Sequence, residues 1–246
     1  MKVVCYAYLL TILLTSCRVD DVEIDLYSGS RDWARIAIPE GREAYSVVGN
    51  INDTLLATTW TKAFYTTDGG KNWTLSKDFN GHVYLNERND TIFALIGTPY
   101  TENFEYKYAS ICQYLTTNYG KSWFRDSTGH YSHMRKIIGI DTSSTGIVYK
   151  IKDNFTPISP NSATYYINPS SLEKQEASHW EALDLSMSLK LYDVYLDKND
   201  YLYLTASSGY FTKENNALFC CYTDQPGLIY ISKSKLPWVW YFLMKE

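Results

Sequence analysis

The sequence predicts an all-β domain built from repeated units of short strands and tight turns. Three observations predict it: one turn motif occurs at residues 66–73 and again at residues 116–123, four hairpins with Asp, Asn or Gly tips recur along the chain, and Tyr, Phe and Trp form 16% of the sequence. Aromatic side chains favour strands because a flat ring packs well against its cross-strand neighbours. We therefore expect one large β domain behind a short leader.

The first element of the chain is an export signal. Met1 and Lys2 give a positive start, and residues 3–14 form an apolar run that is followed by small residues. The run is shorter than the about 20 helical residues that cross a bilayer core. It therefore predicts a signal peptide of residues 1–16 rather than a transmembrane helix.

Cys17 follows this signal, and residues 14–17, Leu-Thr-Ser-Cys, resemble the lipobox of bacterial lipoproteins. The resemblance implies that Cys17 carries the lipid and begins the mature protein; the alternative is an ordinary signal with an incidental cysteine. A diacylglyceride with a further amide-linked chain would anchor the protein firmly. Residues 17–30 would then be a lipidated tether, whose acidic residues resemble a surface-export signal or form a solvated linker. We expect an outer-membrane lipoprotein of the cell envelope, with the choice between periplasmic and surface face left open.

Composition argues against nucleic acid as a partner and leaves the disulfide state of the cysteines open. A net charge of −4 offers no basic field for a polyphosphate, so nucleic acid is not an expected partner. Cys112, Cys220 and Cys221 lie in the exported part, where disulfides persist. Either Cys112 pairs with one of the adjacent two, or all three are small buried apolar residues.

The turn motif has the pattern Ser/Thr, any residue, Asp/Asn, any residue, Gly, any two residues, Trp. Its defining residues are Thr66, Asp68, Gly70, Trp73, Thr116, Asn118, Gly120 and Trp123. The carboxylate or amide is expected to accept backbone N–H groups of a tight turn, the glycine to adopt a positive φ, and the tryptophan to fold back under the turn. The motif resembles the Asp-box, or BNR repeat, of sialidases and sortilin-type β-propellers. All of these roles are structural, so the motif predicts a fold rather than a chemistry.

Each turn motif belongs to a larger repeated unit. Hairpins with alternating apolar residues are predicted at residues 46–59, 83–95, 137–150 and 192–205. A looser third copy of the motif begins at Ala163 and puts Asn168 in the Asp position. Two hairpins per unit make a four-stranded blade, and the four units span residues 45–79, 82–128, 136–186 and 191–243.

The predicted fold is therefore a small β-propeller that occupies residues 31–246. It has four four-stranded blades, or five if residues 18–44 and 206–246 contain the rest of another blade. Residues 33–38 are expected to form a strand that pairs with the last unit and closes the ring. Closure would remove the exposed sheet edges that invite aggregation.

The sequence predicts no catalytic residue, no metal and no cofactor. The resemblance to sialidases implies an arginine trio, a Tyr–Glu pair and a mobile Asp, but residues 35–39 only loosely match the Arg-Ile-Pro element and the chain is much shorter. His130 and His133 have no carboxylate or cysteine nearby at ligand spacing. Four aspartates close in sequence are interpreted as solvent-facing: Asp184, Asp193, Asp197 and Asp200. No phosphate-binding glycine loop or nucleophile elbow occurs.

We therefore expect a non-catalytic binding module that recognises a protein partner, for example an immunity or inhibitor protein against a toxin that reaches the envelope. Loops at residues 99–108, 155–162 and 207–216 would carry specificity. Four aromatic residues are candidates for the binding face, unless they pack under loops: Tyr108, Tyr131, Tyr210 and Phe211. The alternative is a glycan-binding protein or a glycoside hydrolase related to sialidases.

Overall fold

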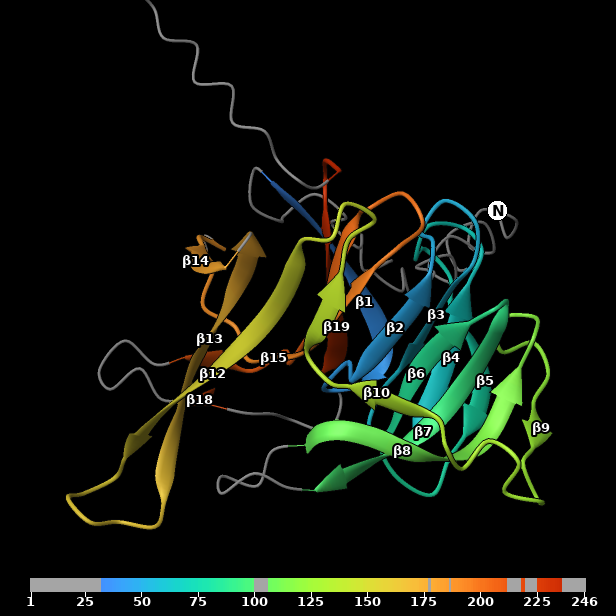
Figure 1. Ribbon diagram of the computed structural model, residues 1–246, viewed down its shortest axis with the longest axis horizontal. Coiled ribbons are helices and arrows are strands. Elements are labelled where there is room, and N and C mark those ends of the chain that lie inside the picture. Colours follow the sequence, from blue (N-terminus) through green and yellow to red (C-terminus); the bar gives the residue numbers. More distant parts are fainter. Residues whose placement is uncertain are drawn as a thin grey trace, which may run out of the picture.

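The structure is a computed structural model that describes residues 32–99, 106–176, 178–185, 187–211, 218–219 and 225–235. These residues form four antiparallel sheets arranged as the blades of a β-propeller (Figure 1). The all-β prediction is confirmed, and the blade number is four. Within the described ranges, no helix has the length and hydropathy needed to cross a membrane. The predicted signal, Cys17, the tether, Cys220 and Cys221 lie outside the described residues.

The first two blades follow the predicted order of strands, from the axis of the propeller outward. Blade 1 contains β2 (Ser46–Gly49), β3 (Leu55–Thr58), β4 (Lys62–Thr66) and β5 (Thr74–Asp78). Blade 2 contains β6 (Val83–Arg88), β7 (Thr91–Pro99), β8 (Tyr106–Thr116) and β9 (Phe124–Arg125). A short strand, β10 (Arg135–Ile137), pairs with the other end of β8 and leads into the next blade.

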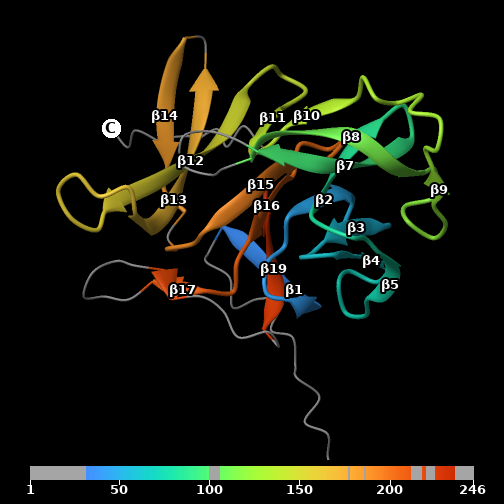
Figure 2. The same cartoon turned by 90° about the horizontal axis from the view of Figure 1, so that it is seen from below.

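The last two blades have the same arrangement. Blade 3 contains β11 (Ile140–Thr142), β12 (Val148–Pro157), β13 (Tyr165–Glu176) and β14 (His179–Leu183). Blade 4 contains β15 (Leu191–Leu196), β16 (Leu202–Ala206), β19 (Pro226–Ser232) and β1 (Trp33–Gly41). Between β16 and β19, a small hairpin is formed by β17 (Tyr210–Phe211) and β18 (Leu218–Phe219) (Figure 2).

The ring is closed by the N-terminal strand, as predicted. β1 is the outer strand of blade 4, and its register with β19 runs from Trp33↔Ser232 to Gly41↔Pro226. Ile36 and Ile38 on this strand are buried in the core between blades 4 and 1. The two ends of the domain are therefore joined by backbone hydrogen bonds and by apolar packing.

The core lies between adjacent blades rather than inside one layer. Val47 packs in the cluster between blades 4 and 1, and its neighbour Val48 packs in the cluster between blades 1 and 2. Successive side chains of a strand point to opposite faces, so an inner strand is buried on both faces. This explains why every residue of β16 is buried.

All four predicted hairpins form, with tips at residues 50–54, 89–90, 143–147 and 197–201. In the tightest of them, Asn89 and Asp90 both have positive φ angles, 49° and 58°. Asn and Asp tolerate this conformation, which matches the twist of a two-residue hairpin. The tips gather at one end of the propeller, called the tip end below, and the opposite end is called the far end.

The predicted third copy of the turn motif is wrong. Asn168 lies within β13 opposite Asn154, and its Nδ2 donates a hydrogen bond to Thr156 Oγ1 at 2.6 Å. The position that needs a glycine is occupied by Ser170, so the chain lacks the residue that adopts a positive φ without steric strain. β13 instead continues in extended conformation to Glu176.

Candidate functional site

The first turn motif has the expected hydrogen bonds. The Asp68 carboxylate accepts the backbone N–H of Asn72 at 2.9 Å and its side-chain amide at 2.7 Å. These bonds lower the pKa of Asp68 to about 2. Thr66 Oγ1 donates to Asp68 Oδ1 and accepts the N–H of Gly70, whose φ is 84°. The polar groups of the turn therefore satisfy one another.

The second turn repeats this arrangement with an amide in place of the carboxylate. Asn118 Oδ1 accepts the N–H of Ser122 at 2.9 Å, and Thr116 Oγ1 accepts the N–H of Gly120 at 3.0 Å. A Cβ on Gly120 would lie 2.6 Å from Ser76 Oγ, and the φ of Gly120 is 81°, so only glycine fits. These residues shape the turn and leave no group free for chemistry.

The two tryptophans pack under their turns in different polar surroundings. Trp73 contacts the core between blades 4 and 1, and its Nε1 is buried without a hydrogen-bond partner. Trp123 packs between blades 1 and 2, and its Nε1 donates to Ser76 Oγ at 2.7 Å. Trp123 therefore joins blade 2 to blade 1 by a polar contact that Trp73 does not make to a neighbouring blade.

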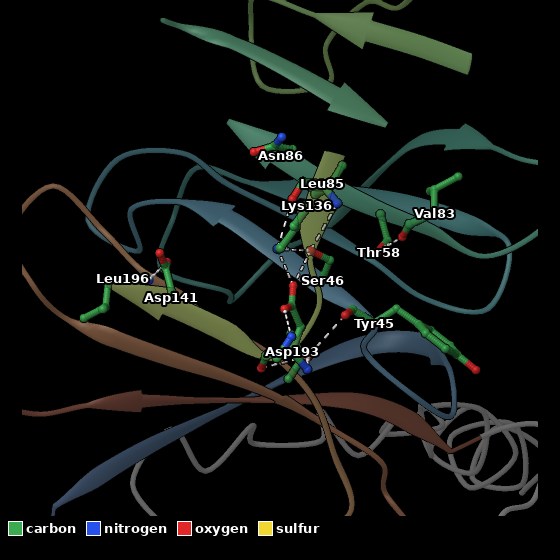
Figure 3. A network of polar contacts seen from close by, with 12 residues as sticks. Tyr45, Ser46, Thr58, Val83, Leu85, Asn86, Lys136, Asp141, Asp193 and Leu196 are labelled. Carbon is green, nitrogen blue, oxygen red and sulfur yellow. Dashed lines mark hydrogen bonds and ion pairs between the residues drawn. The ribbon is translucent and has the colours of Figure 1, made fainter. Parts of the chain in front are cut away.

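A charged network lies at the axis of the propeller (Figure 3). Asp193 on β15 is only 1% exposed and forms an ion pair with Lys136 on β10. The Asp193 carboxylate also accepts Ser46 Oγ–H from blade 1 at 2.8 Å and the N–H of Gly139, before blade 3, at 3.0 Å. Lys136 Nζ donates to Leu85 O in blade 2 at 3.0 Å. One buried ion pair thus joins all four blades.

The structure corrects the interpretation of two of the four aspartates as solvent-facing, whereas Asp184 is exposed as expected. Asp193 and Asp197 are both buried. Asp197 accepts the backbone N–H groups of Asn199 and Tyr201 inside the fourth hairpin tip, and the amide of Asn50 in the first tip. Asp200 is partly buried, and it accepts the N–H of Ser144 at 2.8 Å from the third tip.

Above this network, a cleft of about 610 Å³ opens at the tip end. All four blades or their connections contribute to its wall. The lining residues are Val48, Leu85, Asn86, Glu87, Asn89, Asp90, Lys136, Ile137, Ile140, Asp141, Thr142, Tyr195, Leu196, Asp197 and Lys198. A neighbouring cavity of about 310 Å³ shares Glu87, Tyr195, Asp197 and Lys198 with it, so the two form one groove across the hairpin tips.

Glu87 is one of the two carboxylates, with Asp197, that line both cavities. It accepts Tyr119 Oη–H at 2.9 Å and Tyr195 Oη–H at 3.0 Å, one from the second turn motif and one from blade 4. Burial and the bond to Glu87 raise the pKa of Tyr119 to about 12, and burial and the nearby Glu87 charge also raise the pKa of Tyr195. Both hydroxyls therefore remain protonated and act as donors. The carboxylate is thereby fixed in position at the wall of the groove.

Asp141 lies on the blade 3 side of the same groove. Its carboxylate accepts the N–H of Leu196 at 2.7 Å and that of Thr142 at 2.8 Å. Burial raises its pKa above the ordinary value for an aspartate. Because carboxylates outnumber the ammonium groups of Lys136 and Lys198 in the wall, the groove is suited to a cationic or hydrogen-donating group.

The aromatic residues proposed for the binding face have different environments. Tyr108 is exposed on β8, opposite Ile137, which lines the cleft. Tyr131 is partly buried and packs on Phe93 with ring centroids 4.9 Å apart, as the packing alternative expected. Phe211 is partly exposed in the β17–β18 hairpin, where Tyr210 also lies. Of the four, Tyr108 is the one next to the cleft.

A second aromatic group lies at the far end. His82 contacts both Tyr45, at a tilt, and Trp60, edge-on, with ring centroids 4.5 and 4.3 Å away. Glu43, beneath them, accepts the hydroxyls of Tyr45 and Tyr192 at 2.7 Å each. Burial lowers the pKa of His82, so its neutral form is favoured. This cluster joins blades 1, 2 and 4 at the end opposite the cleft.

Within the described residues, no three His, Cys, Asp or Glu side chains are grouped so as to hold a metal ion. Cys112 is a buried free cysteine in the core of blade 2. Burial raises the pKa of its thiol to about 11, so the reactive thiolate is disfavoured. Cys112 therefore behaves as a small apolar residue.

Fold and groove together define a four-bladed β-propeller with an acidic, polar groove at its tip end. No protein-family model and no curated protein matches the sequence. Among solved structures, a GH43_12 protein retrieved from a capybara gut metagenome is 14% identical over 70% of this chain, with a TM-score of 0.29; the chain spans 38% of that protein. The second solved structure is YCF48 bound to D1 peptide, which is 13% identical with a TM-score of 0.20; the alignment covers 78% of this chain and 72% of that protein.

Proposed function

We propose that the chain is a non-catalytic binding module of the cell envelope, anchored through Cys17, that recognises a protein partner through the groove at the tip end. The observation that carries the proposal is the convergence of all four blades on one open groove with fixed carboxylates. A ligand that enters it contacts Glu87, Asp141 and Tyr195 from three different blades. The chemistry of the wall favours a lysine or arginine side chain of the partner.

The immobility of the groove supports a role in recognition. Glu87 is held by two tyrosine hydroxyls, and Asp141 by two backbone N–H groups. Groups that are already oriented lose little conformational entropy when a partner binds. The exposed Tyr108 and Ile137 next to the cleft add the apolar contact that protein interfaces use.

The proposal includes the origin of the turn motifs and the location of the protein. The two turns have the hydrogen bonds expected of an Asp-box, so we propose a relationship to the Asp-box propellers. Residues 14–17 support attachment of a lipid at Cys17 in the outer membrane. A lipid-anchored module that captures a protein at the envelope suits an immunity or inhibitor protein against a toxin.

The test is affinity capture from envelope extract with the full chain and two matched variants. Glu87→Gln removes a charge from the groove, and Asp78→Asn removes one from the outer strand β5. We expect one stoichiometric protein to be retained by the wild type and by Asp78→Asn, and to be lost with Glu87→Gln. Equal retention by both variants would refute the groove as the binding site. Turnover of envelope glycans with no retained protein would favour the glycan-binding or hydrolase alternative.

A further inference from the structure

The long hairpin of blade 3 extends beyond the other strands of the blade. β12 and β13 pair from Val148↔Gln175 to Pro157↔Tyr165. β11 covers only residues 148–150 of β12, and β14 covers only residues 172–176 of β13. Residues 154–168 therefore form a two-stranded arm, which projects from the blades in Figures 1 and 2.

The two faces of the arm differ in chemistry. Successive residues alternate between the faces, and directly paired residues share one. One face, called the apolar face, consists of Phe155, Pro157, Tyr165 and Ile167. The other, called the polar face, consists of Asn154, Thr156, Tyr166 and Asn168. The arm thus has the alternating pattern that is typical of a strand pair whose apolar face is buried.

Most of the apolar face is nevertheless exposed. Tyr165 is 42% exposed and Ile167 is 36% exposed, and Pro157 is exposed as well, whereas Phe155 is partly buried, with Lys190 Nζ 5.8 Å from its ring centroid. A two-stranded hairpin with an uncovered apolar face is marginally stable in water, and a contiguous apolar patch usually marks an interface. The projection of this arm into solvent therefore calls for a covering surface.

The absence of charge on the arm indicates which surface covers its apolar face. No charged residue occurs from residue 154 to residue 172, although charged residues form 20% of the chain. The chain has a net charge of −4, so two copies carry net charge of the same sign. An uncharged face avoids like-charge repulsion at the contact. In a twofold dimer the same patch is used on both subunits, so an apolar patch is complementary to itself.

We infer that two copies of this chain associate by packing the apolar faces of their arms against each other about a twofold axis. Two layers of paired strands then enclose Phe155, Tyr165 and Ile167 of each copy. The apolar face has only four residues, so the contact is at the small end for a specific interface and we expect a weak dimer. The inference does not depend on the groove at the tip end, and it goes beyond the proposed function.

The test is the mass of the full chain in non-ionic detergent, measured by sedimentation over a concentration series. Tyr165→Lys and Ile167→Lys place a charge on the apolar face, and each should raise the dissociation constant at least about tenfold. Tyr166→Lys is the matched control, because Tyr166 is the adjacent residue, is 37% exposed and belongs to the polar face. It should leave the dimer unchanged.

Any one of three results would overturn the inference. The first is a wild type that remains a monomer throughout the concentration series. The second is a dimer that persists in both apolar-face variants, and the third is a Tyr166→Lys variant whose dimer is weakened as much as that of Tyr165→Lys. Because all three positions are exposed, we expect each variant to keep the melting temperature of the monomeric fold. A melting curve of each variant shows whether loss of the dimer reflects loss of the arm contact rather than unfolding.

Discussion

Replacing Lys136 by methionine tests whether the axial ion pair holds the four blades together. The variant removes the ammonium group from a site where Asp193 is 1% exposed and keeps most of the side-chain volume. The carboxylate retains Ser46 Oγ–H and the N–H of Gly139, but it has no opposite charge left. Leaving one member of a buried ion pair without its partner typically lowers the free energy of unfolding by about 3–5 kcal/mol.

This magnitude is large enough to measure in a domain of this size. A loss of 1 kcal/mol shifts the melting temperature of a domain of 150–250 residues by about 2–4 °C, so Lys136→Met should lower it by about 6–20 °C. The matched control is Lys198→Met, because Lys198 pairs with Asp90 at 3.6 Å and both side chains are largely exposed. An exposed pair contributes about 0–1 kcal/mol.

The assay is urea denaturation of wild type, both single variants and Lys136→Met/Asp193→Asn. The double variant removes the stranded charge, while the amide oxygen introduced on β15 can still accept a hydrogen bond, so it should recover most of the lost stability. If Lys136→Met is no more destabilising than Lys198→Met, the axial pair does not hold the blades together and the reasoning fails.

Three further predictions concern single side chains. Trp123→Phe should destabilise the protein by about 1–2 kcal/mol more than Trp73→Phe, because only Trp123 Nε1 loses a hydrogen bond, to Ser76; equal losses in urea denaturation would contradict this. His82 has a pKa that burial lowers, so stability is fully present above the unfolded-state value of about 6.5 and falls as the pH drops below it. His82→Phe should remove part of that loss, seen as a smaller difference in melting temperature between pH 7.5 and pH 5.5 than in the wild type. Cys17→Ser should release the protein from the membrane fraction without changing its melting temperature, and continued membrane association would argue against a lipid anchor at this residue.

The elements that the sequence predicts correctly are those specified by short stretches of chain. The β6–β7 turn depends on Asn89 and Asp90, which lie between two alternating apolar runs. Likewise, the turn at residues 66–73 depends on a carboxylate, a glycine and a tryptophan close together. Closure of the ring by β1 is also predictable, because residues 33–38 form an apolar strand that has no partner in the neighbouring sequence.

Asn168 shows where local resemblance misleads. The residues before it resemble the strand that leads into the first turn motif, but Ser170 stands where the motif requires a glycine. Without a positive φ the chain stays extended as far as Glu176, and β13 pairs with β12 from Tyr165 to Gln175. The length of the arm follows from this same failure to turn.

The groove and the axial ion pair were beyond sequence reasoning for a different reason. Asp193 and Lys136 are far apart in the chain, and neither lies in a motif. Aspartate next to a strand is usually exposed, so the interpretation of Asp193 as a solvent-facing residue followed the general rule. A charged residue inside an otherwise apolar or aromatic inner strand, such as Asp193 in β15, is the signal to seek once a propeller is predicted.

The register of blade 4 also decides which end of the propeller a lipid anchor would be attached to. Trp33 pairs with Ser232, and Ser232 Oγ accepts the N–H of Leu202 next to the fourth hairpin tip, so the described domain begins at the tip end. Residues 18–32, fully extended, reach about 50 Å. An anchor at Cys17 would therefore keep the start of β1, at the tip end, within about 50 Å of the bilayer. A partner of the groove would then be a protein that is present within this distance of the membrane.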